Sequence, residues 1–225
     1  AIAVTYGPGL MGSLLIGVNF VKAMSLSLKI PFLGINHLEG HLFSNYIENK
    51  KIIFPILSLL VSGGHTQLWL VDDYDKFTLL GETIDDAAGE AFDKVARMLK
   101  LGYPGGPLIE KKAQIGSPAA YRFPRAFLEN GSLDFSFSGL KTSVRNMIAK
   151  RRENKGPILS DEDISAGFQE AVVEVLTSKL ILACKKERLN RVVVTGGVAA
   201  NRALRERVIR ESEKYQIKAS FPDPI

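Results

Sequence analysis

The stretch that decides the fold is residues 192–201, with the sequence VVVTGGVAAN. Its β-branched residues predict a buried strand, and the glycine pair predicts a turn. A helix is expected over 201–214 and another strand over 217–221. A glycine turn before a helix N-terminus favours an anion, although Asn201 could serve only as the helix N-cap.

The same order of strand, glycine turn, helix and strand occurs at the start of the chain. Residues 1–6 and 31–35 predict strands around a helix that ends near residue 29. Between the two copies, three strands over 56–61, 67–71 and 77–82 are followed by a helix over 87–101. Such a meander, followed by helix, strand, helix and strand, forms one lobe of the actin-like ATPase architecture.

We therefore expect an α/β protein with the actin-like ATPase (sugar kinase, heat-shock protein and actin) two-lobe fold. The chain would be a fragment that lacks the start of lobe one and the C-terminal segment. Residues 1–54 would be the C-terminal part of lobe one, and residues 55–225 would be lobe two with a helical insertion at about 102–160. A single doubly wound α/β domain is the rival fold, and the three-strand meander counts against it.

The composition is that of an ordinary globular protein, with 46% hydrophobic and 24% charged residues. No apolar run is expected to reach the length of a membrane span, so no membrane partner is expected. The single cysteine, Cys184, excludes an internal disulfide, is interpreted as a packing residue and suits a cytoplasmic location. A net charge of +5 permits an anionic partner such as RNA, but many enzymes are equally basic.

Two of the three histidines, His37 and His41, are four residues apart on a predicted helix over 37–49. This spacing places both imidazoles on one helix face, where they can bind one metal ion. Glu39 lies about 200° around the helix from His37, unlike the glutamate that directly follows the first histidine in zinc proteases. The alternative is a pair of surface histidines without a ligand.

Three further stretches have both a functional and a structural interpretation. The turn at Ser62–Gly64 could bind a phosphate through its backbone or be a plain hairpin turn. Asp93 could accept hydrogen bonds from a ribose or face solvent. Residues 102–107 (GYPGGP) are too rich in helix breakers for a helix or strand, and their bare backbone could lie against an adenine.

A basic segment and a glycine motif complete the candidates. Residues 134–152 predict a charged helix face that could contact RNA or simply be solvated. Its cations are Lys141, Arg145, Lys150, Arg151 and Arg152. Gly7, Gly9 and Gly12 fit a dinucleotide-binding pattern, but no acidic residue follows the next strand, so an NAD site is disfavoured.

Six motifs, in this order, carry a resemblance to one family. They are NHLEGH (36–41), LVSGGHTQL (60–68), DDAAGEAFDK (85–94), YPGGP (103–107), DFSFSGLKT (134–142) and GGVAAN (196–201). The chain resembles the bacterial tRNA N6-adenosine threonylcarbamoyltransferases, which were formerly called O-sialoglycoprotein endopeptidases or glycoproteases. The resemblance covers nearly the whole chain.

The resemblance implies transfer of a threonylcarbamoyl group from threonylcarbamoyl-AMP to N6 of the adenosine next to the anticodon, in tRNAs that read ANN codons. It implies one divalent metal ion, iron with zinc or magnesium as alternatives, bound by His37 and His41. It also implies partner proteins, namely an inactive homologue, an ATPase and an adenylate synthase. The implied contacts to the nucleotide or adenylate are Leu60, Val61, Ser62, Gly63, Gly64, Asp93, Gly106, Glu110 and Asn201.

The chain departs from the family pattern in three places. Glu110 stands where relatives often have aspartate, so its contact to a ribose is in doubt. The N-terminal ETSCDET motif and the C-terminal CTDN motif, whose aspartate is the third metal ligand, have no counterpart. The chain alone is therefore expected to be inactive. Two other hypotheses are a metal-dependent glycoprotein endopeptidase and a non-catalytic nucleotide-binding scaffold.

Overall fold

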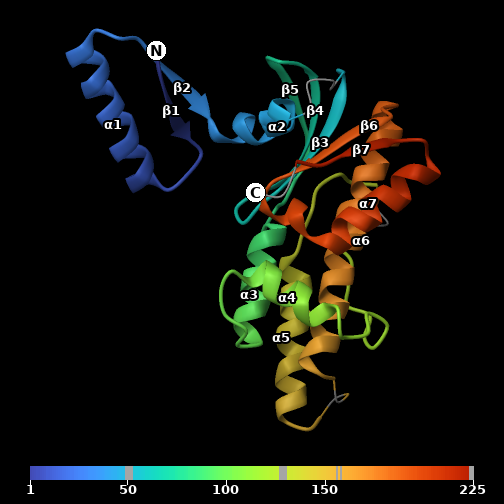
Figure 1. Ribbon diagram of the computed structural model, residues 1–225. Coiled ribbons are helices and arrows are strands. Elements are labelled where there is room, and N and C mark those ends of the chain that lie inside the picture. Colours follow the sequence, from blue (N-terminus) through green and yellow to red (C-terminus); the bar gives the residue numbers. More distant parts are fainter. Residues whose placement is uncertain (49–52, 127–130, 156, 158, 223–225) are drawn as a thin grey trace. The chain divides into compact units, whose positions relative to one another are not determined.

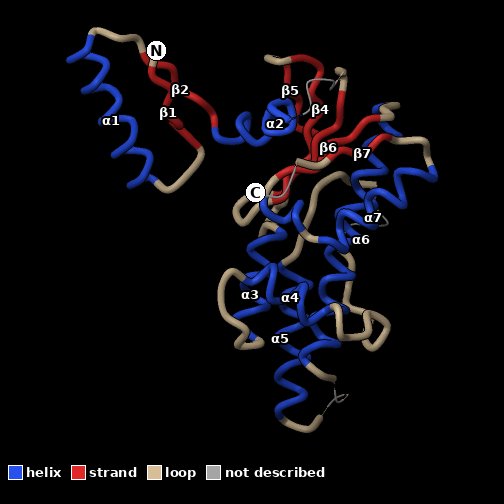
Figure 2. Tube along the Cα trace, viewed as in Figure 1, coloured by secondary structure: helices blue, strands red, loops and turns tan. Residues whose placement is uncertain are grey.

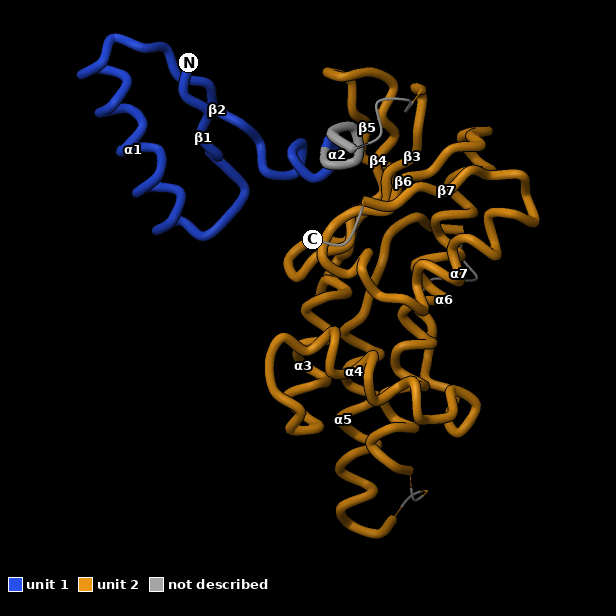
Figure 3. Tube along the Cα trace, viewed as in Figure 1, with its two compact units in different colours: residues 1–51 blue, residues 52–225 orange. Residues whose placement is uncertain are grey.

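The computed structural model describes residues 1–48, 53–126, 131–155, 157 and 159–222. The chain divides into two compact units, Ala1–Lys51 and Ile52–Ile225, which Figure 3 shows in different colours. The assignment of these units to two lobes of a larger protein, with a helical insertion at about 102–160, stays a prediction.

Unit 1 is a β-α-β motif followed by a helix. Its elements are β1 (Ile2–Gly7), α1 (Met11–Leu28), β2 (Phe32–Asn36) and α2 (His37–Glu48). The two strands are parallel, with Ile2 opposite Phe32. At the end of α1, Lys29 adopts the left-handed conformation and its N–H donates to the Ser25 carbonyl. The order predicted for the first copy of the repeat is therefore confirmed.

The apolar character of α1 corrects one expectation from the sequence. This helix has 18 residues and a mean hydropathy of 1.4, which is long and apolar enough to cross a membrane by length and composition alone. The sequence expectation was wrong. Serines and an asparagine interrupt the apolar run, but Lys22 is the only charged residue of the helix. Core helices and signal sequences have the same composition, so this feature is only a weak sign of a membrane.

Unit 2 contains a five-stranded sheet in the order β5-β4-β3-β6-β7 (labelled in Figure 1), and Figure 2 shows its strands in red. The strands β3 (Ile56–Val61), β4 (Thr66–Asp73) and β5 (Lys76–Glu82) form an antiparallel meander. The strands β6 (Arg191–Thr195) and β7 (Lys218–Ser220) continue the sheet in parallel on the other side of β3. Every residue of β3 is buried, as expected for a central strand. The predicted meander is confirmed.

Five α-helices and one 3-10 helix accompany this sheet in the described part of unit 2. They are α3 (Ala88–Met98), α4 (Gly105–Ala113), α5 (Ser138–Arg152), α6 (Asp161–Glu187), η1 (Gly197–Ala200) and α7 (Arg202–Lys214). Figure 1 shows α3, α4 and α5 grouped together, away from the sheet. The long helix α6 contacts α4, α5, α7 and β3, which explains why it is buried on most of its surface. Its N-cap residue, Ser160, accepts a hydrogen bond from the Asp163 N–H.

The prediction that residues 102–107 form neither helix nor strand was wrong, because α4 begins at Gly105. Pro107 lies in the first turn of this helix, where a backbone N–H has no partner within the helix, so proline is tolerated. The Gly105 N–H donates to Asp93 Oδ1 at 2.8 Å. A tertiary contact thus starts a helix that local composition argues against.

Cys184 is the packing residue that the sequence predicts. It is 2% exposed on α6, within the hydrophobic core. Burial raises the pKa of its thiol to about 12, so the thiolate required for nucleophilic chemistry is scarcely populated at neutral pH.

Candidate functional site

The site begins where two neighbouring strands end. Because β3 and β6 are adjacent and parallel, the turns that follow them meet at the same edge of the sheet. Gly196 follows β6 with a φ of 92°, and a Cβ added there would lie 2.4 Å from the Val61 carbonyl oxygen. Only glycine allows this left-handed conformation and this close approach together.

The turn that follows β3 is held by its own hydrogen bonds. The Ser62 N–H donates to the His65 carbonyl at 2.8 Å, and Ser62 Oγ accepts from the His65 N–H at 3.1 Å. Gly64 makes a longer contact to the same Oγ, at 3.4 Å. Since Oγ is the acceptor in both contacts, the hydroxyl proton of Ser62 is not used by them and can be donated to a ligand.

The N-termini of α3 and α4 are fixed beside this turn. Thr66 Oγ1 accepts from the Ala88 N–H at 2.9 Å, and the Gly89 N–H donates to the Ser62 carbonyl at 3.2 Å. A Cβ added to Gly105 would lie 2.6 Å from the Asp93 Cα, so α4 starts in direct backbone contact with α3. Asp93 binds the Gly105 N–H through one oxygen, which leaves the other oxygen for a ligand.

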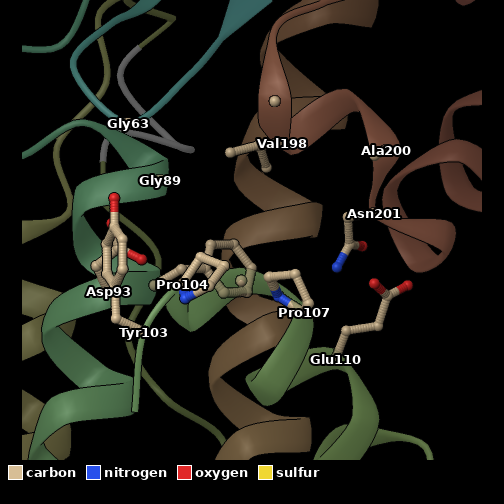
Figure 4. A pocket seen from close by; sticks show the side chains of 13 residues that line it. Gly63, Gly89, Asp93, Tyr103, Pro104, Pro107, Glu110, Val198, Ala200 and Asn201 are labelled. Atoms are coloured by element: carbon tan, nitrogen blue, oxygen red, sulfur yellow. The ribbon is translucent and has the colours of Figure 1, made fainter. Parts of the chain in front are cut away.

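These elements enclose a cavity of about 380 Å³. In Figure 4, Asp93 and Tyr103 lie on one side of it, and Glu110 and Asn201 lie on the other. The lining residues are Gly63, Gly89, Phe92, Asp93, Tyr103, Pro104, Gly106, Pro107, Glu110, Gly197, Val198, Ala200 and Asn201. The cavity thus combines a mainly apolar and backbone wall with a few polar side chains, as ligand sites usually do.

The sequence predicted five of these lining residues, namely Gly63, Asp93, Gly106, Glu110 and Asn201. The other four residues predicted to bind the substrate, Leu60, Val61, Ser62 and Gly64, do not line the cavity. The side chains of Leu60 and Val61 are fully buried in β3, so they support the turn from behind.

Glu110 and Asn201 meet at the N-terminus of α7. Asn201 Oδ1 accepts from the Leu204 N–H at 3.0 Å, so the predicted N-cap is present. The Asn201 amide also donates to Gln169 Oε1 at 2.8 Å. Glu110 Oε1 accepts from the Arg202 N–H at 2.7 Å, which leaves Glu110 Oε2 as the free acceptor of this pair. A negative charge at a helix N-terminus is favourable.

Sequence reasoning missed the apolar and aromatic side chains of the wall. Phe92, Tyr103 and Val198 line the cavity, although only polar or glycine residues were selected from their motifs. Their position inside the motifs over 85–94, 103–107 and 192–201 was the available signal. Apolar residues within a motif are as informative about a pocket as its hydrogen-bonding residues.

His37 and His41 lie on α2 in unit 1, and their ring centroids are 4.6 Å apart in an edge-to-face arrangement. Two imidazoles on one helix face fit a metal such as iron or zinc in the chemistry of their donor atoms. Among the residues that the structure describes, no group of three or more His, Cys, Asp or Glu side chains is placed to bind a metal ion. Two histidines are fewer than the three or four protein ligands that bind zinc in proteins.

The motif over residues 134–142 has a structural role that the sequence did not predict. Asp85 accepts hydrogen bonds from the N–H groups of Phe137 and Ser138, at 2.9 and 3.2 Å, and so binds the N-terminus of α5. Asp86 binds Lys94 and Lys141. Lys141 is thus held in an ion pair, and its expected place among cations available to RNA is corrected.

The two carboxylates of this cluster have lowered pKa values. Burial by itself raises the pKa of Asp85, but hydrogen bonds from Ser136, Phe137 and Ser138 outweigh burial and lower it. Burial opposes ionisation of Asp86 too, and the hydrogen bonds and charges of Lys141 and Lys94 lower its pKa. Both groups are therefore ionised at neutral pH and hold α5 to the loop before α3.

Comparison with solved structures supports the topology. The chain aligns with full-length HypF, in its phosphate- and nucleotide-bound form, with a TM-score of 0.70 and 14% identity over 97% of this chain and 43% of that chain. It aligns with component A of (R)-2-hydroxyglutaryl-CoA dehydratase from Acidaminococcus fermentans with a TM-score of 0.53 and 16% identity, over 88% of this chain and 66% of that one. These likenesses show the fold alone, and it is the expected actin-like ATPase fold.

Comparison of the sequence is more specific. The family model for TsaD, tRNA N6-adenosine threonylcarbamoyltransferase, matches residues 1–225. The tRNA N6-adenosine threonylcarbamoyltransferase of Desulfitobacterium hafniense (strain Y51) is 54% identical over 224 residues, which cover 100% of this chain and 65% of that protein. The protein of the same name from Clostridioides difficile (strain 630) is 51% identical over 225 residues, 100% of this chain and 66% of that protein.

The chain therefore spans just under two thirds of the length of these relatives. The family model nevertheless matches all residues of this chain. In each of the two pairwise alignments, more than half of the aligned positions are identical. From this match we conclude that the chain belongs to the family of tRNA N6-adenosine threonylcarbamoyltransferases.

Proposed function

We propose that the protein that contains this chain transfers a threonylcarbamoyl group from threonylcarbamoyl-AMP to N6 of the adenosine next to the anticodon, in tRNAs that read ANN codons. The observation that supports this most is the cavity of unit 2, where residues from separate motifs meet around a volume of about 380 Å³. This volume suits a nucleotide-sized ligand. The family match supports the choice of tRNA and the adenylate as substrates.

The adenosine part of the adenylate would lie in this cavity. The free carboxylate oxygen of Asp93 would accept a hydrogen bond from a ribose hydroxyl, and Glu110 Oε2 offers a second acceptor across the cavity. Phe92 and Val198 supply apolar surface for the base. Gly106 lines the cavity without a side chain, so the backbone can lie directly against the ligand.

The phosphate and the threonylcarbamoyl group would lie at the turn after β3. Gly63 of this turn lines the cavity, and the Ser62 hydroxyl and the Gly63 N–H are donors that the hydrogen bonds within the turn do not use. In the reaction, the N6 amine attacks the carbamoyl carbon, the bond from this carbon to the phosphate oxygen breaks, AMP leaves with the electron pair, and the amine loses a proton. Donors fixed in advance stabilise the charge that develops on the oxygens.

His37 and His41 would hold a divalent metal ion, for which we propose iron, with zinc or magnesium as alternatives. When bound, such an ion would supply a positive charge that stabilises negative charge developing on a substrate. We further propose that the protein acts in the cytoplasm with an inactive homologue, an ATPase and the enzyme that makes the adenylate. The endopeptidase hypothesis is not favoured, because Glu39 does not directly follow the first histidine as the glutamate of zinc proteases does.

The proposal is tested in cells whose only copy of the complete natural protein carries Asp93→Ala. Mass spectrometry of their tRNA is expected to find threonylcarbamoyladenosine reduced at least tenfold. Glu213→Ala, which removes an exposed carboxylate of α7, is the control and should leave the level unchanged. A normal level in the Asp93→Ala strain would contradict the nucleotide site.

The metal role is tested separately with the double variant His37→Ala and His41→Ala. Metal content of the purified complete protein should fall by at least half of one ion per chain relative to the unmodified protein. Unchanged metal content, or a normal level of threonylcarbamoyladenosine in the tRNA, would contradict this role.

A further inference from the structure

Side chains along one face of α3 connect the cavity to a second one. Gly89 and Asp93 line the first cavity, and Asp93 also lines a second cavity of about 360 Å³, together with Arg97 and Lys100. Gly89, Asp93 and Arg97 are spaced four residues apart on α3, so they lie on the same side of this helix. Tyr103 lines both cavities, so the second cavity lies directly beside the first.

Arg97 and Lys100 also line a third cavity, of about 310 Å³, between α3 and α5. We call this third cavity the basic groove. On α5 it is lined by Arg145, Ile148, Ala149 and Arg152, whose spacing of three, four and seven residues from Arg145 places them on one helix face. Met98 completes the lining, in which there is no aspartate or glutamate. The basic groove therefore presents four cations above a partly apolar floor.

The four cations of the basic groove differ from their neighbours in their pairing. Within residues 1–48, 53–126, 131–155, 157 and 159–222, no ion pair includes any of the four. On the same two helices, Lys94 and Lys141 both bind Asp86, and Arg151 binds Asp161 at 2.7 Å. Cations that serve the fold are paired here, and those of the basic groove are left for another partner.

The helix dipole does not account for this cluster. It favours cations in the last turn of a helix, which covers Arg97 on α3 and Arg152 on α5. Arg145 lies in the middle of α5, two turns earlier, and Lys100 lies beyond the end of α3. Their placement follows the groove and not the helix ends.

The chemistry of the groove suits a chain of phosphates. Arginine binds phosphate oxygens through two parallel N–H donors. Arg145 and Arg152 are about 10 Å apart along the helix axis, farther than the spacing of about 3.4 Å per nucleotide in a duplex strand, so they would bind different phosphates. Tyr103, which is 80% exposed at the edge of the first cavity, offers a ring on which a base can stack.

We propose that the basic groove binds the sugar-phosphate backbone of a single-stranded RNA loop, and that Tyr103, at the edge of the first cavity, stacks on a base of this loop. The identity of the RNA as tRNA rests on the proposed function. The groove would hold the loop beside the acceptor position, so that the N6 amine reaches the adenylate from the Tyr103 side.

The test uses the complete natural protein with Arg145→Gln and Arg152→Gln, and a fluorescent hairpin with the anticodon stem and loop of a tRNA as the probe. Fluorescence anisotropy between 50 and 200 mM KCl should show binding at least tenfold weaker at 100 mM. The slope of log K against log salt should fall by about 1.4, because each single-strand contact contributes about 0.7. Binding of AMP, measured by calorimetry, should stay within twofold and show that the variant is folded.

The matched control is the double variant Arg188→Gln and Lys218→Gln, which removes two exposed cations of unit 2 that do not line these three cavities. It should bind the hairpin within twofold of the unmodified protein. Weaker RNA binding by the groove variant alone supports the proposal even if no group transfer is found. Unchanged RNA binding overturns it even if transfer is normal, and so does loss of an acidic protein partner with RNA binding retained.

Discussion

The two β-α-β motifs of the chain share a topology and differ in packing. In unit 1, α1 exposes Ile16 (74%) and Phe20 (65%), whereas in unit 2 the apolar residues Leu204 and Val208 of α7 are fully buried. The glycine turns differ in the same way, since an added Cβ meets nothing at Gly7 or Gly12 but meets backbone at Gly196. Local sequence therefore forms the motif, and packing is what makes individual residues irreplaceable.

The largest contrast is expected at the glycine turns. Gly196→Ala should lower the free energy of unfolding by about 4 kcal/mol, from strain at positive φ and from the clash with the Val61 carbonyl. Gly12→Ala, in the first turn of α1, should instead stabilise its helix by about 0.5 kcal/mol. Urea unfolding monitored by the fluorescence of Trp69 and hydrogen exchange of α1 amides would measure the two effects. Equal changes in stability for the two variants would contradict this contrast between the glycine turns.

The helices provide the next contrast. Leu204→Ala in α7 should cost about 3 kcal/mol, because it removes a fully buried side chain and leaves a cavity. Ile16→Ala in α1 should change stability by less than about 0.5 kcal/mol in this chain, because the side chain is already exposed. A large loss of stability for Ile16→Ala, measured by chemical unfolding of the same chain, would show that this face of α1 is buried.

Substitutions at the two helix N-caps should change the free energy of unfolding by smaller amounts, and the two changes should have opposite signs. Asn201→Ala should cost about 1.5 kcal/mol, since it removes the cap of α7 and leaves Gln169 without its partner. At the equivalent position before α1, Leu10 makes no side-chain cap bond, so Leu10→Asn should stabilise by about 0.5 kcal/mol. Thermal unfolding of the two variants in parallel checks whether the changes have opposite signs.

The smallest effect depends on pH and belongs to the ion pairs that Asp86 makes with Lys94 and Lys141 in unit 2. The folded pKa of Asp86 is lowered, so its stabilisation is present above the unfolded pKa of about 3.9 and is lost as pH falls below it. Asp86→Asn should therefore cost about 1 kcal/mol at pH 7 and little at pH 3. Asp75→Asn, at an exposed turn, should show no such pH dependence in urea titrations.

The sequence predicted the order of the elements well because apolar periodicity and glycine turns are local properties. It failed at α4, whose first turn depends on the contact between Gly105 and Asp93, 12 residues apart. It also treated Lys141 as a free cation, because the partner Asp86 lies 55 residues earlier. Tertiary partners of this kind leave no periodic signal.

The candidate site could be predicted from the sequence to about the same extent as the fold. Motifs identified Asp93, Glu110 and Asn201, which line the cavity. They did not reveal that Glu110 also binds the Arg202 N–H or that Asn201 binds Gln169. The basic segment was interpreted along α5 alone, whereas the basic groove also requires Arg97 of α3 and Lys100, which follows the end of α3. Only the packing of the helices brings these residues together.

The crowded backbone around Gly105 and Gly196 has a consequence for drug resistance. An inhibitor whose contacts are mainly to main-chain N–H and C=O groups of these turns would meet a wall that substitution can alter only by disrupting the fold. Escape would then have to change lining side chains such as Asp93, Glu110 and Asn201, which the proposed substrate also needs. Resistance at this site would therefore carry a direct loss of fitness.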